Sequence, residues 1–198
     1  MEMIRFEKWW VNRDKKAERN IVRVRQSLAE LPVETIQDVL ELGCGIGAVA
    51  AFLSKTYHMT VWGTDYDPEQ IQIARKRHPE NERLTYRVED AMHLTFKNAS
   101  FDLVVSQNVF HHLSNWQAAV GEVGRVLRSR GFLLWLDLAF PRWIARLFQP
   151  LVKKHGIYGI GDAQAAFKKQ GFKQLFHERR IHGPLIQHHV IWQKSEAI

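Results

Sequence analysis

The sequence has a single cysteine, Cys44, among its 198 residues. One cysteine cannot form an internal disulfide, so the chain fits a reducing compartment and we expect a cytoplasmic protein. Charged side chains interrupt the first ten residues, which predicts that they are not a signal peptide. The longest apolar run, residues 132–140, contains Asp137 and is far shorter than the roughly 20 residues needed to cross a bilayer.

The sequence also lacks the short signatures of several enzyme classes. It has no C-x-x-C pair, no H-E-x-x-H and no Ser-His-Asp series. His188 and His189 are adjacent on an expected strand, so they point to opposite faces and cannot bind one ion together. We therefore expect no metal site.

An excess of basic residues, 28 against 21 acidic ones, gives a net charge of +7. This charge attracts nucleic acid, an anionic membrane face or an anionic cofactor without selecting among them. No aromatic residues for stacking on bases are set between the scattered lysines and arginines, so we expect no specific nucleic-acid binding. The oligomeric state is left open.

Hydrophobic periodicity predicts alternating strands and helices. Apolar residues at helical spacing predict an amphipathic helix over 13–31, ended by Pro32, and Asp162 is expected to cap a last helix that Gly171 closes. Strands are expected at 39–42, 59–64, 84–88, 101–105, 131–138, 172–179 and 185–193, with further helices at 48–55, 68–77 and 116–127. The alternation predicts parallel strands covered on both faces, and the short turn before residue 185 forces antiparallel pairing of the last strand.

A glycine loop follows the first expected strand and precedes a helix. In this position glycines let the backbone approach a ligand at the helix N-terminus. Gly43, Gly45 and Ala48 fit the dinucleotide pattern G-x-G-x-x-G/A, whereas Glu41 with the glycines up to Gly47 gives E-x-G-x-G-x-G. The loop alone does not decide between the two patterns, and glycines that only make a tight turn are the structural alternative.

Carboxylates end the next two expected strands. Asp65 ends the second strand, where it can accept hydrogen bonds from both hydroxyls of a ribose. Glu89, Asp90 and Ala91 follow the third strand and bring another carboxylate to the same edge, able to accept from an adenine amino group. The pattern predicts an adenosine-type ligand in a crevice at this edge, although a solvated aspartate is the plainer reading of Asp65.

From about residue 37 to 193 the sequence resembles the class I S-adenosylmethionine-dependent methyltransferases. The matching segments are Val39-Leu40-Glu41-Leu42-Gly43-Cys44-Gly45-Ile46-Gly47, Thr64-Asp65, Glu89-Asp90-Ala91, Phe101-Asp102-Leu103-Val104-Val105, His111-His112-Leu113, and Arg125-Val126-Leu127 before Gly131. The resemblance implies an α/β fold, doubly wound and Rossmann-like, with a seven-stranded, mostly parallel sheet and an antiparallel last strand. It also implies a single domain, with residues 1–36 as an N-terminal helical cap and residues 37–193 as the core, which carries a lid insert at about 140–161.

The resemblance further implies where S-adenosylmethionine binds. Gly43 and Gly45 would lie beside the methionine part of the cofactor, and Gln107 would lie near its sulfonium. Asp65 would bind the ribose. Tyr66 would lie along the adenine, and Asp90 would accept a hydrogen bond from the adenine amino group. The expected cofactor-binding set is Glu41, Gly43, Cys44, Gly45, Gly47, Asp65, Tyr66, Glu89, Asp90, Ala91 and Gln107. A nicotinamide cofactor stays open through the overlap of the two loop patterns.

An activated methyl group needs mainly a positioned nucleophile, so we expect no elaborate catalytic machinery. His111 and His112 are the candidates for a general base, with packing as their alternative role. The expected acceptor is an O, N or C nucleophile of a small molecule, because the motifs are most similar to enzymes of quinone and lipid biosynthesis. An RNA- or protein-directed methyltransferase and a non-catalytic cofactor-binding module are the alternatives.

Substrate contacts are expected from Trp9, Trp10 and Trp143, with packing as the alternative for the first two. Apolar and basic residues share an expected helix at 141–155, which predicts a lid over the pocket or a peripheral contact with an anionic membrane.

Overall fold

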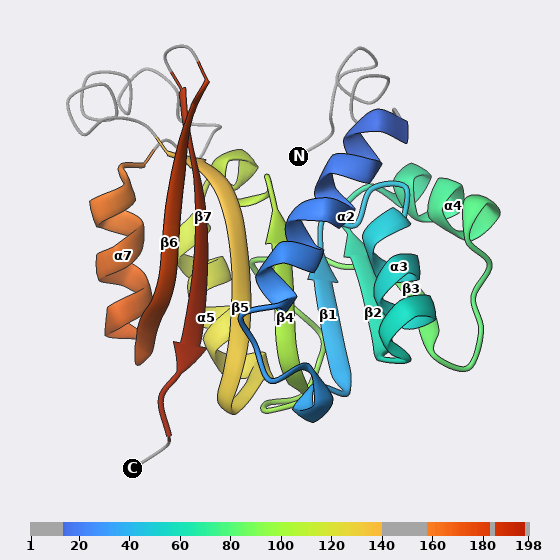
Figure 1. Cartoon of the computed structure of the whole chain (residues 1–198), viewed down its shortest axis with the longest axis horizontal. Coiled ribbons are helices and arrows are strands. Elements are labelled where there is room, and N and C mark those ends of the chain that lie inside the picture. The colour runs from blue at the N-terminus through green and yellow to red at the C-terminus, as the bar shows by residue number, and fades with distance from the viewer. Residues whose placement is uncertain (1–13, 140–157, 183–184, 197–198) are drawn as a thin grey trace.

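The computed structural model describes residues 14–139, 158–182 and 185–196, and within them the strands form one seven-stranded sheet (Figure 1). The strands are β1 (Asp38–Leu42), β2 (Thr60–Asp65), β3 (Leu84–Val88), β4 (Phe101–Gln107), β5 (Leu127–Ala139), β6 (Phe172–His182) and β7 (Leu185–Lys194). The α-helices are α2 (Asp14–Leu28), α3 (Ala48–Tyr57), α4 (Pro68–Arg77), α5 (Trp116–Val126) and α7 (Ile160–Lys169), with short 3₁₀ helices η1 (Val33–Thr35) and η2 (Phe110–His112).

The strand order is β3-β2-β1-β4-β5-β7-β6. The first five strands pair in parallel, and β7 pairs antiparallel with both β5 and β6. The predicted fold class, including the reversed last strand, is therefore confirmed. β1 and β4 are neighbours in the sheet, and the strand order reverses direction between them, which makes this position the switch point. In open α/β sheets, ligands bind at the switch point, outside the carboxyl ends of the strands.

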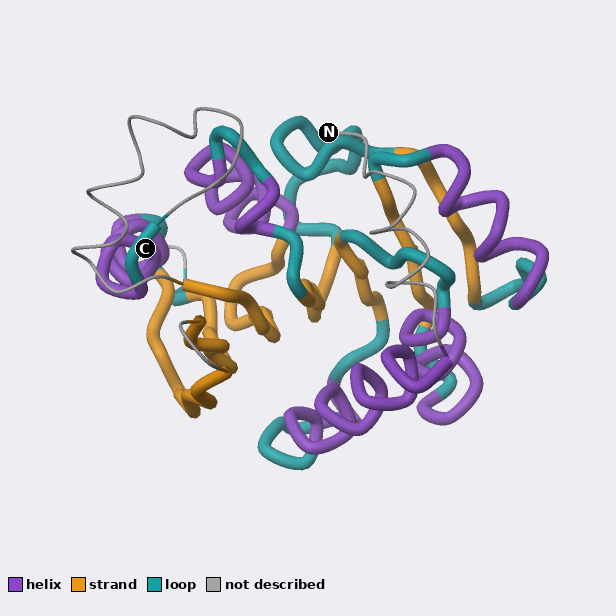
Figure 2. Tube along the Cα trace, turned by 90° about the horizontal axis from the view of Figure 1, so that it is seen from above, coloured by secondary structure: helices purple, strands orange, loops and turns teal. Residues whose placement is uncertain are grey.

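Helices cover both faces of the sheet, as Figure 2 shows from above. Because side chains alternate along a strand, Val39 packs with α2, α3 and α4, whereas the adjacent Leu40 packs with α5 and α7. The strands at the centre are thus buried on both sides, which explains their near-continuous apolar sequences.

Several helix ends differ from the predictions, among them the end of α2 and the start of α7. Helix α2 ends at Leu28, and a turn rather than helix leads to Pro32. Gly159, not Asp162, occupies the position before α7; Asp162 lies in the first turn, where its carboxylate accepts the Gly159 amide at 3.1 Å. A carboxylate in the first turn can reach back to the cap residue's backbone, so an acidic residue near a helix start does not by itself mark the cap. Gly171, at φ +78°, closes the helix as predicted.

Trp9, Trp10, Trp143 and most of the expected lid insert lie outside the described residues. At the end of that insert, Tyr158 is buried in the core with α5 and α7, and Ile160 begins α7. No helix among residues 14–139 and 158–182 is long and apolar enough to cross a membrane.

Candidate active site

A cleft of about 780 Å³ opens at the carboxyl ends of the parallel strands, at the switch point of the sheet. It brings together ten of the eleven residues expected to bind a cofactor and both candidate bases. These residues are Glu41, Gly43, Cys44, Gly45, Asp65, Tyr66, Glu89, Asp90, Ala91, Gln107, His111 and His112. The cleft therefore unites segments that lie far apart in the sequence.

The glycine loop is held against the end of β2. The amide of Cys44 donates to the carbonyl of Thr64 at 2.8 Å, and the amide of Gly45 donates to Asp65 Oδ2 at 2.9 Å. Gly43 and Gly45 have φ of +66° and +52°, a left-handed conformation that favours glycine. A Cβ at Gly43 would lie 2.5 Å from Val109 Cγ2, so this glycine also lets the loop pack against the segment after β4.

Asp65 occupies the end of β2 with both carboxylate oxygens facing backbone donors. Oδ2 accepts from Gly45 and Oδ1 accepts the amide of Asp67 at 3.0 Å. Burial raises the pKa of Asp65, while these two hydrogen bonds act in the opposite direction. A carboxylate has about four lone-pair sites, so each oxygen retains capacity for a further donor, such as a ligand hydroxyl.

Glu41 is a buried carboxyl group of the cleft with one unpartnered oxygen. The residue is 4% exposed, and its Oε2 atom has no hydrogen-bond partner. Burial raises the pKa of Glu41 to about 8, and nearby Asp65 acts in the same direction. Burial also raises the pKa of the neighbouring Cys44 thiol, so the thiol is uncharged at neutral pH. A cationic group in the cleft would restore the ionised form of Glu41.

Two residues of the expected set, Gly47 and Glu89, have close partners within the protein. Gly47 is not among the residues that line the cleft. A Cβ there would lie 2.5 Å from Tyr86 Oη, and its carbonyl accepts from that hydroxyl at 3.1 Å, so Gly47 serves the packing of the loop on β3. Glu89 lines the cleft, but its two oxygens accept the hydroxyl and the amide of Thr95 at 2.5 and 2.9 Å and thereby fix the loop after β3.

Tyr66 and Asp90 lie at the open side of the cleft. Tyr66 is 52% exposed, which is unusual for a large aromatic residue and leaves its ring accessible to a planar ligand. Asp90 Oδ1 accepts the amide of Met92 at 2.8 Å, and Oδ2 faces His93 Nδ1 at 3.5 Å.

Helix α2 forms a wall of the cleft that the sequence did not predict. Lys16, Ala17, Arg19, Asn20 and Arg23 line it. Gln107 ties this wall to the sheet, because its side-chain amide donates to the carbonyl of Asn20 at 3.2 Å. The polar residues between the apolar positions of α2 are a sequence signal, but they look the same as an ordinary solvent-facing side of a helix.

His111 has a buried acidic partner. Its Nδ1 lies 2.5 Å from Oδ1 of Asp137, a residue of β5 that is fully buried. Among the described residues, nothing bonds to Nε2 of His111. In the sequence, Asp137 is visible only as a charged residue within an apolar strand. Its role becomes clear only from its contact with His111 in the structure. Within the described residues no group of three His, Cys, Asp or Glu side chains is placed to hold a metal ion.

Residues 40–135 match the family described as "Methyltransferase domain". An O-methyltransferase of Pyrenophora dematioidea is 34% identical over 105 residues, 52% of this chain and 39% of that protein. A 2-methyl-6-phytyl-1,4-hydroquinone methyltransferase of Synechocystis is 34% identical over 99 residues, 50% of this chain and 31% of that protein. The chain thus matches less than half the length of these relatives.

The fold is also that of solved methyltransferases. A putative sarcosine dimethylglycine methyltransferase from Galdieria sulphuraria superposes on this chain with a TM-score of 0.78 at 17% sequence identity. The superposition covers 93% of this chain and 88% of the other. Fold and cleft define a Rossmann-like α/β protein with a large cleft at the switch point of the sheet. Residues 40–135, just under half of the chain, are similar to the methyltransferase-domain family, which agrees with the resemblance of the sequence to the class I methyltransferases.

Proposed function

We propose that the chain is an S-adenosylmethionine-dependent methyltransferase that transfers a methyl group to an O, N or C nucleophile of a small molecule. The observation that carries this proposal is the joining, in one cleft, of the E-x-G-x-G-x-G loop, Asp65 and the unpartnered carboxylate oxygen of Glu41. The methyltransferase-domain match supports it. The names of the relatives support a small-molecule acceptor, and the hydroquinone methyltransferase supports a quinone or lipid-like one.

The residues of the cleft fit S-adenosylmethionine. The sulfonium and ammonium groups outweigh its carboxylate, so the molecule is cationic and complements the buried carboxylate of Glu41. Asp65 has lone pairs left for the ribose hydroxyls, Tyr66 has an exposed ring face for the adenine, and Asp90 accepts from its amino group. When bound, the cofactor supplies a methyl group that is already activated on sulfur.

The chain's own contribution to the reaction is to position the acceptor and to remove its proton. His111 lines the cleft, and the carboxylate of Asp137 at Nδ1 favours the tautomer with an unprotonated Nε2. That nitrogen takes a proton from a hydroxyl or amine acceptor, and Asp137 stabilises the resulting imidazolium. Gln107 ties α2 to the sheet, and α2 lines the cleft, which supports the proposal that the N-terminal residues serve as a cap on a single domain.

Two measurements test the proposal. Isothermal titration calorimetry should show stoichiometric binding of S-adenosylmethionine and of S-adenosylhomocysteine. Incubation with methyl-labelled S-adenosylmethionine and a small-molecule extract should then place label in a low-molecular-weight product. Failure of both compounds to bind would contradict the proposal, and label found only in RNA or protein would favour a macromolecular acceptor.

A further inference from the structure

Charge is divided between the two sides of the cleft. Carboxylates lie at the ends of β1, β2 and β3, where Glu41, Asp65 and Asp90 line it. The facing wall on α2 is basic and carries Arg19 and Arg23. The acidic side complements the sulfonium and ammonium groups of the cofactor, and the basic wall offers a place for an anionic group of the second ligand of the reaction, the acceptor.

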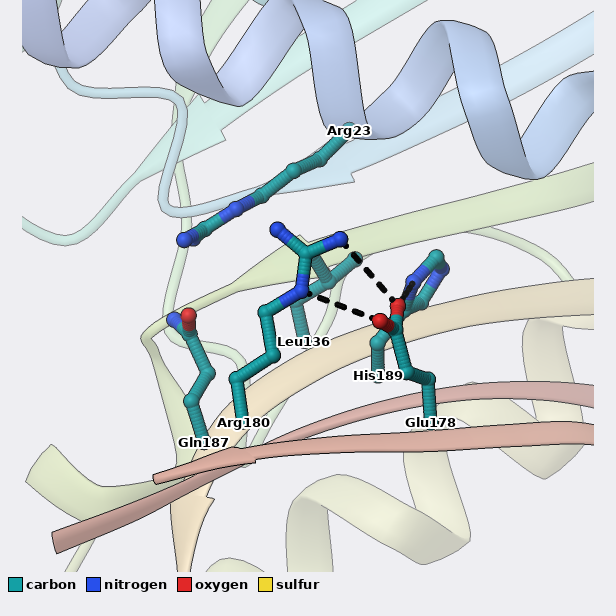
Figure 3. A pocket seen from close by; sticks show the side chains of 6 residues that line it. All are labelled: Arg23, Leu136, Glu178, Arg180, Gln187 and His189. Carbon is teal, nitrogen blue, oxygen red and sulfur yellow. Dashed lines mark hydrogen bonds and ion pairs between the residues drawn. The ribbon is translucent and has the colours of Figure 1, made fainter. Parts of the chain in front are cut away.

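Arg23 is the central residue of this basic wall. It is half-buried and lines both the cleft and a small pocket that extends behind it toward β6. Figure 3 shows Arg23 reaching from α2 over the sheet while Arg180 and Gln187 extend toward it; the pocket lining is Arg23, Leu136, Glu178, Arg180, Gln187 and His189. Among the described residues, no carboxylate lies within ion-pairing distance of Arg23.

The neighbours of Arg23 do not neutralise its charge. Burial, and then the nearby charges of Arg180 and Arg19, lower the pKa of Arg23, and only Glu178 opposes them. Glu178 is already paired with Arg180, whose Nε lies 3.1 Å from Oε1 and whose terminal nitrogen lies 3.4 Å from Oε2. One carboxylate therefore faces two guanidinium groups.

His189 adds a neutral group to the same pocket. Burial lowers the pKa of His189 to about 4, so the ring is neutral at pH 7, and its Nε2 lies 2.6 Å from the hydroxyl of Ser27. Gln187, at the join between the pocket and the cleft, donates its side-chain amide to Asn108 at 3.2 Å. The site therefore keeps one unmatched positive charge between neutral polar side chains, and an unpaired half-buried charge is costly until an anion meets it.

We propose that the methyl acceptor carries a carboxylate or phosphate group, which Arg23 binds as a specificity-determining residue, with Arg19 beside it on the same wall of the cleft. This inference rests on the proposed function and names the class of its substrate. The planar guanidinium presents paired N–H donors that match the two oxygens of a carboxylate or phosphate. With the anion held at the α2 wall, the rest of the acceptor extends into the cleft toward His111 and the cofactor side.

The test measures binding of benzoate and phenyl phosphate, with benzamide as the neutral counterpart, by ligand-observed NMR at low salt with saturating S-adenosylhomocysteine. At least one anion should bind saturably and benzamide should bind at least tenfold more weakly. Arg23→Gln should raise the Kd of the anion about tenfold or more. Arg25→Gln is the matched control, because Arg25 lies on the same helix but stacks on Phe52 and does not line the cleft. The Arg25→Gln variant should bind the anion with the same affinity as the unaltered protein.

Equal affinity in the unaltered protein and Arg23→Gln, or no saturable binding of either anion, would overturn the inference. Arg19→Gln provides a second variant, at another arginine that lines the cleft, and should also weaken binding of the anion. A preference for benzoate over phenyl phosphate, or the reverse, identifies which oxyanion the acceptor carries. If S-adenosylhomocysteine itself fails to bind, the proposed function fails, and the same titrations without it still test Arg23.

Discussion

His111 Nδ1 lies 2.5 Å from Asp137 Oδ1, and the carboxylate that makes this contact is anchored from several directions. Its Oδ2 accepts the amides of Val109 and Phe110 at 3.0 and 2.7 Å, and its Oδ1 also accepts the amide of Leu138. Asp137 therefore has a fixed orientation, and it fixes the orientation of His111 in turn. Such support is what a general base needs in order to present one nitrogen to its substrate.

We predict that His111→Gln lowers the rate of methyl transfer to a hydroxyl or amine acceptor by roughly 10²–10⁴-fold. Binding of S-adenosylhomocysteine should be almost unchanged, because His111 acts on the acceptor. Steady-state kinetics at saturating S-adenosylmethionine measure the effect. His93→Gln is the control, since the His93 side chain is 80% exposed. Equal rates in both variants would exclude His111 as the base.

We predict that Asp65→Asn weakens the binding of S-adenosylhomocysteine by about 1–3 kcal/mol. The amide retains one oxygen for the Gly45 or Asp67 backbone donors but lacks the charge and the acceptor capacity that two ribose hydroxyls require. Calorimetry measures the affinity, and thermal unfolding shows whether the loop is still held. Asp38 lies at the amino end of β1, away from the cleft, and is paired with Arg128. Asp38→Asn should therefore bind S-adenosylhomocysteine as the unaltered protein does. Unchanged affinity in Asp65→Asn would remove Asp65 from the site.

Glu41 predicts a pH dependence whose sign follows from its raised pKa. The folded protein holds the Glu41 proton up to about pH 8, whereas the unfolded chain loses it near pH 4.3, so Glu41 lowers the free energy of unfolding as pH rises between these values. A cationic ligand favours the carboxylate and lowers its pKa, so binding of S-adenosylmethionine at pH 7 should release close to one proton.

Calorimetry in buffers of different ionisation enthalpy counts the protons released. The affinity should rise with pH up to about 8 in the unaltered protein. Glu41→Gln should abolish both the proton release and this rise. The same number of protons released by the variant and the unaltered protein would assign the titration to another group.

The sequence predicted most of the fold because its signals are local. The predicted bounds of α4, 68–77, and of β3, 84–88, are the observed ones; Pro68 occupies the first turn of α4, and apolar Leu84, Tyr86 and Val88 alternate with polar residues along β3. The short connection before β7 predicted the reversed strand for a geometric reason that needs no tertiary information. The glycine loop and the carboxylates at strand ends predicted a ligand crevice at this edge, and the resemblance to methyltransferases added the other residues of the ten that the structure brings to the cleft.

Other features could not be predicted because they depend on contacts between distant segments. Asp137 becomes informative only when η2 brings His111 to it, 26 residues away. Arg23 is one of several basic residues on α2, and only the packing of that helix distinguishes it from Arg25. Gly47 fits a ligand pattern, whereas the ring of Tyr86, 39 residues away, is what occupies the space beside it.

We predict that Gly47→Ala destabilises the protein by about 2–4 kcal/mol. The new Cβ would lie 2.5 Å from Tyr86 Oη and 2.8 Å from two ring carbons, in a residue whose φ is +77°. Tyr86 is 1% exposed, so its ring has little room to move. Gly161→Ala is the matched control: no atom lies within 4 Å of its Cβ position, and alanine favours the helix α7. Chemical denaturation measures both variants. The control should be as stable as the unaltered protein or slightly more so, whereas equal stability of Gly47→Ala would mean that Tyr86 can give way and that Gly47 is needed for some other reason.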